Sequence, residues 1–279
     1  MGYITGKDGM VNGADTVRLW RIEPLSPGGP YAGSDAAGAI DRIDGWKDWK
    51  GQYAAYGHTP SSMPGTALSF IGSIDHSVGV YGTAIVEAVT IDIENPQEED
   101  QPPTPINHIV EFKGNGALNR GAAVATDASV PNVPNPKELK IEYATPAAVQ
   151  SYTTFSSVYR ARLRFSCNNP LYRPGAGSGL TNRLAGNIDA RLQFEMYESA
   201  ATNLPTEGNN YGIKVYVTST LFWYVDWMKL EAITPFEVPI ETRKLVYANL
   251  DWALKSTHLI GATPTRGSIK RPDTTTWWP

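Results

Sequence analysis

The amino-acid sequence predicts an all-β protein of two tandem, related antiparallel domains of the β-sandwich or barrel type. Its 279 residues include 26 glycines and 21 prolines, which interrupt almost every segment. Such punctuation is typical of many short strands joined by turns. The strongly apolar runs are rich in Val, Ile, Tyr and Trp, and apolar residues at helical spacing are rare, which favours strands. An internal repeat predicts the tandem arrangement.

The repeat is clearest between residues 42–64 and 183–205, which align at a constant shift of 141 positions. Six of these 23 positions are identical, where unrelated sequences give about one or two. The identical pairs are Arg42 and Arg183, Gly45 and Gly186, Asp48 and Asp189, Gln52 and Gln193, Tyr56 and Tyr197, and Pro64 and Pro205. The alternative is that two unrelated β segments merely share their composition.

Two shorter blocks follow in the same order. Residues 85–89 resemble 229–233, and residues 109–112 resemble 244–247. This order predicts a first domain over residues 1–121, an extended linker over 122–140 and a second domain over 141–279. The linker carries Pro131, Pro134 and Pro136 and few large apolar residues, so we expect it to run extended.

The predicted strands differ in how they are covered. In residues 84–94, Ile85, Val89, Ile91 and Ile93 fall on one face, and Glu87 interrupts the alternation. This pattern predicts a strand buried mainly on one side. Residues 214–228 are apolar on both faces over their later half, which predicts that other copies of the chain cover the second face.

Eight tryptophans are unevenly distributed. An indole offers a large contact area at low entropic cost, so the cluster can form core, an assembly interface or a sugar-binding platform. Residues 274–279 carry two adjacent tryptophans, and we expect this tail to dock on a neighbouring domain or subunit. The candidate assembly-interface residues are Trp223, Trp227, Trp277 and Trp278.

Charge and composition disfavour several functions. The formal net charge is 24 minus 28, or −4, so there is no summed positive field to hold nucleic acid. No apolar run approaches the roughly 18 residues of a membrane span, and the N-terminus lacks a signal-peptide pattern, so we expect assembly in a cytoplasm and no membrane partner. Cys167 is the only cysteine, which predicts a buried core residue and no disulfide.

No pattern indicates catalysis, a cofactor or a metal, and we predict that the protein is not an enzyme. The four histidines, at positions 58, 76, 108 and 258, do not have the spacing of paired metal ligands. Residues 75–77 (Asp-His-Ser) and 114–116 (Gly-Asn-Gly) are interpreted as turns. The acidic residues 98–100 predict a solvated loop, with weak calcium binding as the alternative.

Five short segments together resemble tail-tube-like structural proteins of tailed bacteriophages. They are residues 2–13, the Trp-bearing 17–22, and 45–53, 82–89 and 110–116, and the repeat extends the likeness to 160–255. The resemblance implies a virion protein that self-assembles into stacked rings, contacts other virion proteins and lets DNA pass transiently. The Gly-, Ala- and Pro-rich residues 26–41 stand where such subunits send an arm to the next ring.

This chain departs from a plain tube protein by carrying two copies of the pattern. Three two-copy chains would present six similar domains and so match a six-fold tube, whereas six chains are the other ring size expected. Two alternatives stay open. One is a capsid decoration or cement protein, and the other is a carbohydrate-binding fibre or adhesin module.

Overall fold

The fold is given by a computed structural model of residues 1–279. The structure describes residues 10–11, 16–25, 29–32, 40–43, 48–73, 79–95, 104–121, 136–145, 151–155, 158–172, 182–183, 186, 188–197, 205–237, 247–254, 269–272 and 276–278. In this part of the chain all strands pair antiparallel, and the helical structure is one 3₁₀ turn, Pro136–Glu138. The predicted all-β class is therefore confirmed.

Ten strands form two sets of five with the same connectivity. The first set, in the order β6-β7-β8-β5-β2, comprises β2 (Thr16–Leu25), β5 (Asp48–Tyr56), β6 (Ala67–Ser73), β7 (Gly79–Glu94) and β8 (Asn107–Gly121). The second, in the order β15-β16-β17-β14-β11, comprises β11 (Val158–Cys167), β14 (Ile188–Tyr197), β15 (Asn210–Tyr216), β16 (Phe222–Glu237) and β17 (Tyr247–Leu254). Each strand of the first set thus has a counterpart at the same place in the second set. The pairs are β2 and β11, β5 and β14, β6 and β15, β7 and β16, and β8 and β17.

The smaller strands repeat this correspondence. A hairpin follows the first strand of each set, β3–β4 (Gly29–Ala32 and Ile40–Ile43) and β12–β13 (Leu171–Tyr172 and Asn182–Arg183). An added strand flanks β6 and β15, namely β1 (Met10–Val11) and β9 (Lys140–Ala144). β10 (Thr153–Phe155) pairs with β9, and β18 (Ile269–Lys270) joins β16 to β19 (Thr276–Trp278).

The strand registers support the predicted repeat in detail. Gln52 stands opposite Arg21 and Glu111, and Gln193, 141 positions later, stands opposite Arg162 and Asp251. A β-bulge explains why Glu87 interrupts the alternation, because the register of β7 shifts between Val86 and Ala88. β16 shifts between Leu230 and Ala232, around Glu231. An extra residue at a bulge reverses the side-chain alternation on either side of it.

Two parts of the sequence alignment need correction. The turn before β6 contains Gly65 at φ 83°, and its counterpart before β15 is Gly208 at φ 82°. The shift there is 208 − 65 = 143, so Pro64 and Pro205 are not equivalent. Since Glu111 corresponds to Asp251, the shift in the third block is 251 − 111 = 140, and residues 109–112 match 249–252 in place of 244–247.

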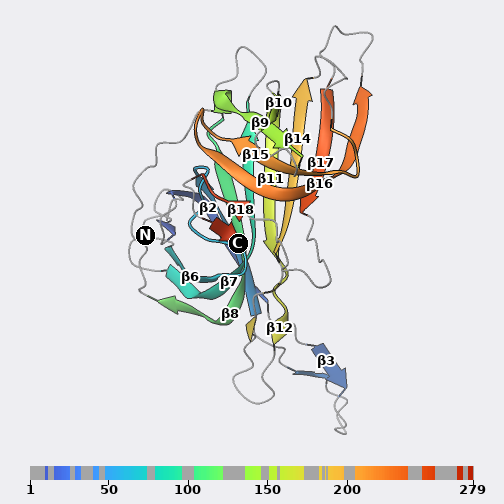
Figure 1. Ribbon diagram of the computed structural model, residues 1–279. Helices are drawn as coiled ribbons and strands as arrows, with labels where there is room; N and C mark the ends of the chain where they lie inside the picture. Colours follow the sequence, from blue (N-terminus) through green and yellow to red (C-terminus); the bar gives the residue numbers. More distant parts are fainter. Residues whose placement is uncertain are drawn as a thin grey trace.

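The two sets fuse edge to edge into one sheet. β7 carries β6 along residues 79–85, and along residues 88–94 of the same edge it carries β11. Figure 1 shows the long strands β7 and β16 bending. Each set thereby curls over the side that carries its buried apolar residues. The described sheet is not closed, because its path ends at β10 and β2.

One apolar core runs through both sets. In the first, the Trp49 and Phe70 rings meet at 6.4 Å, although β5 and β6 are not adjacent in the sheet. In the second, Phe165 and Trp223 meet at 5.1 Å. Contacts between non-adjacent strands are what a sheet folded over itself produces. Cys167 is buried, as predicted.

Two predicted elements differ from the structure. Residues 214–228 are not one strand, because residues 217–221 form a hairpin turn in which Thr218 Oγ1 accepts from Leu221 N at 2.9 Å. A Thr-Ser-Thr turn lacks the Gly, Pro and Asn that mark most turns. Residues 114–116 lie inside β8 as a bulged stretch, since Ala84 pairs with Gly114 and Gly82 with Leu118.

Candidate functional site: the ion-paired face and the free edges of the sheet

Strand alternation gives the fused sheet one apolar face and one charged face. On β11, Ala161, Leu163 and Phe165 are buried in the core, and Arg162 and Arg164 point to the opposite side. Every neighbouring strand repeats this alternation. We call the charged side, carried by β2, β5, the first half of β8, the second half of β7, β11, β14 and the stretch of β16 around Glu231, the open face.

Two arginines on the open face bridge the two halves. Arg164 holds Glu111 with two hydrogen bonds, of 3.0 and 2.9 Å, and donates to Thr90 Oγ1 at 3.1 Å. The bonds to Glu111 raise the pKa of the Arg164 guanidinium, and partial burial opposes them. Arg162 Nε donates to Asp92 at 2.6 Å. Both arginines thus tie β11 to strands of the first half.

The described ion pairs of the open face contain equal numbers of opposite charges. Its ion pairs are Arg21 and Lys50 with Glu23, Lys113 with Glu87, Arg160 with Glu195, Arg162 with Asp92, Arg164 with Glu111, and Arg191 with Asp189 and Glu231. These are seven cations and seven carboxylates, about half-exposed in most cases. Half-exposed pairs contribute about 0–1 kcal/mol each to stability, so their main effect is that each of these cations has a carboxylate partner on the face.

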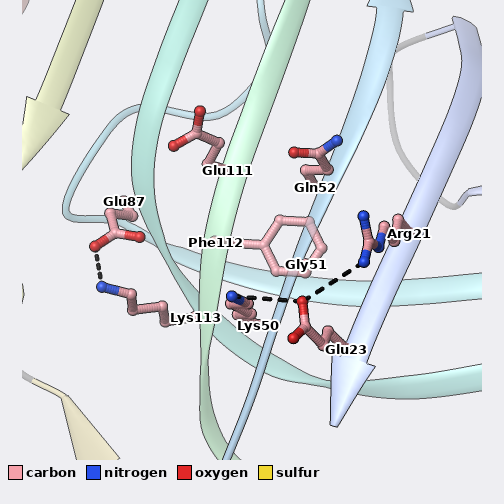
Figure 2. A pocket seen from close by; sticks show the side chains of 9 residues that line it. All are labelled: Arg21, Glu23, Lys50, Gly51, Gln52, Glu87, Glu111, Phe112 and Lys113. Atoms are coloured by element: carbon pink, nitrogen blue, oxygen red, sulfur yellow. Dashed lines mark hydrogen bonds and ion pairs between the residues drawn. The ribbon is translucent and has the colours of Figure 1, made fainter. Parts of the chain in front are cut away.

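Among the open hollows on this face, two have volumes of about 400 and 600 Å³. Figure 2 shows the first, where Glu23 faces Arg21 and Lys50, and Lys113 reaches Glu87. The second surrounds Arg191 and Glu231. The two bulge glutamates, Glu87 and Glu231, therefore occupy matching hollows.

A buried junction lies below the open face, where the β12–β13 hairpin meets the first half. Arg183 donates from Nη2 to Asp48 Oδ2 at 2.5 Å, with side chains 10% and 15% exposed. The Arg183 backbone N–H donates to Asn115 Oδ1 at 2.9 Å. Asn169 Nδ2 donates to the Val86 carbonyl at 3.0 Å. These bonds fasten the halves beyond the β7–β11 pairing.

Several strand edges carry no partner among the described strands, and two of them are the counterparts of the edges of β11 and β7 that pair with each other. One is the outer edge of β2, where Leu19 is 59% exposed, the highest value among the exposed large apolar residues of the described part. The other is the C-terminal half of β16, because β15 pairs only with residues 222–229 on that edge. Unpaired edges present free N–H and C=O groups to any strand that fits.

The four predicted interface tryptophans are not brought together in one described cluster. Trp223 is 0% exposed, and its indole donates to the His58 carbonyl at 3.0 Å. It therefore belongs to the core of its own chain and offers no surface to a neighbour. The backbone of Trp277 and Trp278 lies in β19, which joins the chain's own sheet through β18. The side chains of Trp227, Trp277 and Trp278 lie outside what the structure describes.

Other sequence predictions fall partly outside the described residues, among them residues 75–77, 98–100 and 122–135. Within the described part, no three His, Cys, Asp or Glu side chains group closely enough to hold a metal ion. No described helix is long and apolar enough to cross a membrane.

No family model matches the chain, and no curated protein matches it either.

Sequence reasoning missed the junction, although a signal for it was present. Arg183 and Asp48 each belong to an identical pair of the repeat, with Arg42 and Asp189 as their counterparts. The alignment shows that these residues are identical in the two copies. Only the structure shows that the arginine of the second copy, Arg183, contacts the aspartate of the first copy, Asp48.

Proposed function

We propose that this chain is a self-assembling structural protein of the phage tail-tube type, whose open face lines a conduit for DNA. The observation that carries the proposal is the ion-paired face, whose described pairs leave no excess of positive charge and which continues across two repeated strand sets. A wall for DNA must not hold phosphates, and seven cations matched by seven carboxylates leave no net positive field.

The tandem repeat supports rings of this chain. Three chains would bring together six similar strand sets, and six chains would bring twelve. The partners are then copies of the same chain, stacked rings, other virion proteins and passing DNA, and the place of action is a virion assembled in a host cytoplasm.

Negative-stain electron microscopy of the purified chain tests the proposal. Tubes or stacked rings are the expected result, and a monomer at all concentrations would overturn it. Protein that forms no tube but binds expanded capsids would identify a decoration protein instead. Binding on a glycan array would identify an adhesin module, for which no described tryptophan offers an exposed platform, since Trp49 and Trp223 are buried and Trp20 packs on Phe70.

A further inference from the structure

We propose that copies of this chain join through a second instance of the junction that joins its two halves. β2 of one copy pairs with the C-terminal half of β16 of the next, and the β3–β4 hairpin of the first packs beneath β17 and β14 of the second. This inference rests on the proposed self-assembly and names the partner, the strands and the residues.

The free edge of β2 matches an edge that is already used inside the chain. β2 and β11 hold the same place in their strand sets, each pairing on one side with β5 or β14. On its other side β11 pairs with residues 88–94 of β7. The corresponding side of β2 has no partner in the described part of the chain.

The acceptor edge is matched in the same way. β7 binds β6 over its first half and β11 over its second half, along one edge. β16 binds β15 over its first half, and the rest of that edge carries no described strand. Each chain thus has one donor edge and one different acceptor edge. Such head-to-tail contacts produce closed rings or open filaments.

The register of the inner junction predicts an ion pair between chains. Arg21 corresponds to Arg162, because each stands opposite the glutamine of the neighbouring strand. Glu237 corresponds to Asp92 through the neighbouring strands: Glu237 pairs with Tyr247 and Asp92 with Asn107, and Tyr247 and Asn107 stand opposite Tyr197 and Tyr56. β16 shifts register again between Thr234 and Glu237, where β7 is regular, so this correspondence is made at Glu237 itself. Arg162 and Asp92 form an ion pair at 2.6 Å within the chain. Arg21 of one copy therefore stands opposite Glu237 of the next.

The hairpins predict a second ion pair. Arg183 of β13 pairs with Asp48 at the start of β5. Their counterparts, 141 positions away, are Arg42 in β4 and Asp189 in β14, and both are identical residues. Figure 1 shows the β3–β4 hairpin projecting away from the other described strands, whereas β12 lies at the base of the sheet. A neighbouring copy supplies the surface against which the projecting hairpin packs.

Pro24 makes the junction between chains more dependent on these ion pairs. Asn95 N donates to Tyr159 O at 2.7 Å, so the backbone N–H and C=O of Tyr159 point toward β7. Because these groups alternate in direction along a strand, the N–H groups of Ala161, Leu163 and Phe165 also point toward β7. Pro24 is the counterpart of Phe165 and has no N–H. The ladder between chains lacks that hydrogen bond, and a proline on an edge also discourages unspecific strand pairing.

Charge reversal at the hairpin pair tests the junction. Arg42→Asp and Asp189→Arg each place like charges together, and each should weaken association at least about tenfold in sedimentation velocity. The double variant R42D/D189R restores opposite charges at every junction and should restore assembly. An equal mixture of the two single variants should assemble only with alternating chains, and therefore only into even-numbered closed rings.

Matched controls separate folding from assembly. Arg183→Asp, at the equivalent arginine, should lower the melting temperature of the chain, whereas Arg42→Asp should leave it unchanged and reduce association alone. Arg21→Glu, Glu237→Arg and their double variant repeat the test at the strand pair. Should wild-type rings form and the single reversals leave them intact, or the double variants fail to recover, the junction is wrong while the proposed function stands. A wild-type chain that never associates would overturn the proposed function itself.

Discussion

Arg183 and Asp48 form the least exposed ion pair among those of the described side chains, with Nη2 and Oδ2 2.5 Å apart across 135 residues of sequence. The arginine lies in the hairpin of the second strand set and the aspartate begins β5 of the first. Both charges are largely removed from water, so each depends on the other for compensation. The pair is therefore expected to hold the two halves in one orientation.

Replacing Arg183 with Met should destabilise the chain by about 3–5 kcal/mol, because Asp48 would remain as a buried charge without its partner. Equilibrium urea denaturation measures the change. The double variant R183M/D48N should recover part of the loss, and the double-mutant cycle gives the coupling energy. Arg191→Met is the control, since that half-exposed arginine should contribute no more than about 1 kcal/mol. Equal losses at both arginines would contradict the assignment.

Gly114 lies against the Trp49 indole, which donates to the Gly116 carbonyl at 3.1 Å. A Cβ on Gly114 would stand 2.4 Å from Trp49 Nε1, whereas one on Gly121 of the same strand meets its nearest atom at 3.7 Å. Gly114→Ala should therefore cost about 1–3 kcal/mol through overpacking and shift the tryptophan fluorescence. Gly121→Ala should leave both unchanged, and a stable G114A chain with unaltered fluorescence would contradict the packing.

Neutralising carboxylates on the open face should create a DNA-binding surface. In D92N/E111Q, Arg162 and Arg164 lose their carboxylate partners, so the face acquires a net positive charge. We expect salt-dependent retention of double-stranded DNA in gel-shift assays, with an affinity that falls as salt rises. Glu142→Gln, on β9 outside this face, is the matched control. Equal DNA binding by wild type and D92N/E111Q would show that charge balance does not govern the surface.

The sequence was sufficient to predict the fold class and the repeat, because both depend on local patterns. The identities in residues 42–56 and 183–197 belong to strands in equivalent registers, and the shared Glu-Ala of the second block marks a bulge in each half. The sequence alignment of the third block, residues 109–112, was wrong because a segment of four apolar or charged residues matches the second half at several alignment shifts. Only the pairing of Glu111 with Gln52 and of Asp251 with Gln193 determines the shift there.

The candidate site could be predicted only in part. Alternation assigns Arg162 and Arg164 to one face of a strand, but the carboxylates they meet come from β7 and β8, more than 50 residues away. Trp223 illustrates the opposite limit. Its apolar neighbours suit an interface as well as a core, and only the hairpin turn at residues 217–221 places it inside. Long-range pairing decides both cases, and no local pattern encodes it.

Tyr216 should make stability depend on pH in the alkaline range. Burial and its hydrogen bond to Glu142, at 2.9 Å, raise the pKa of Tyr216 to about 12 from an ordinary 10.0. Because the unfolded phenol ionises first, the stabilising contribution is complete below about pH 10 and is lost as the pH rises towards 12. Tyr216→Phe lacks this contribution, so the difference in urea midpoint between wild type and variant should shrink over that interval. Glu142→Gln removes the charged acceptor and should move the loss to lower pH, whereas a difference that stays constant from pH 9 to about 12 would contradict the raised pKa.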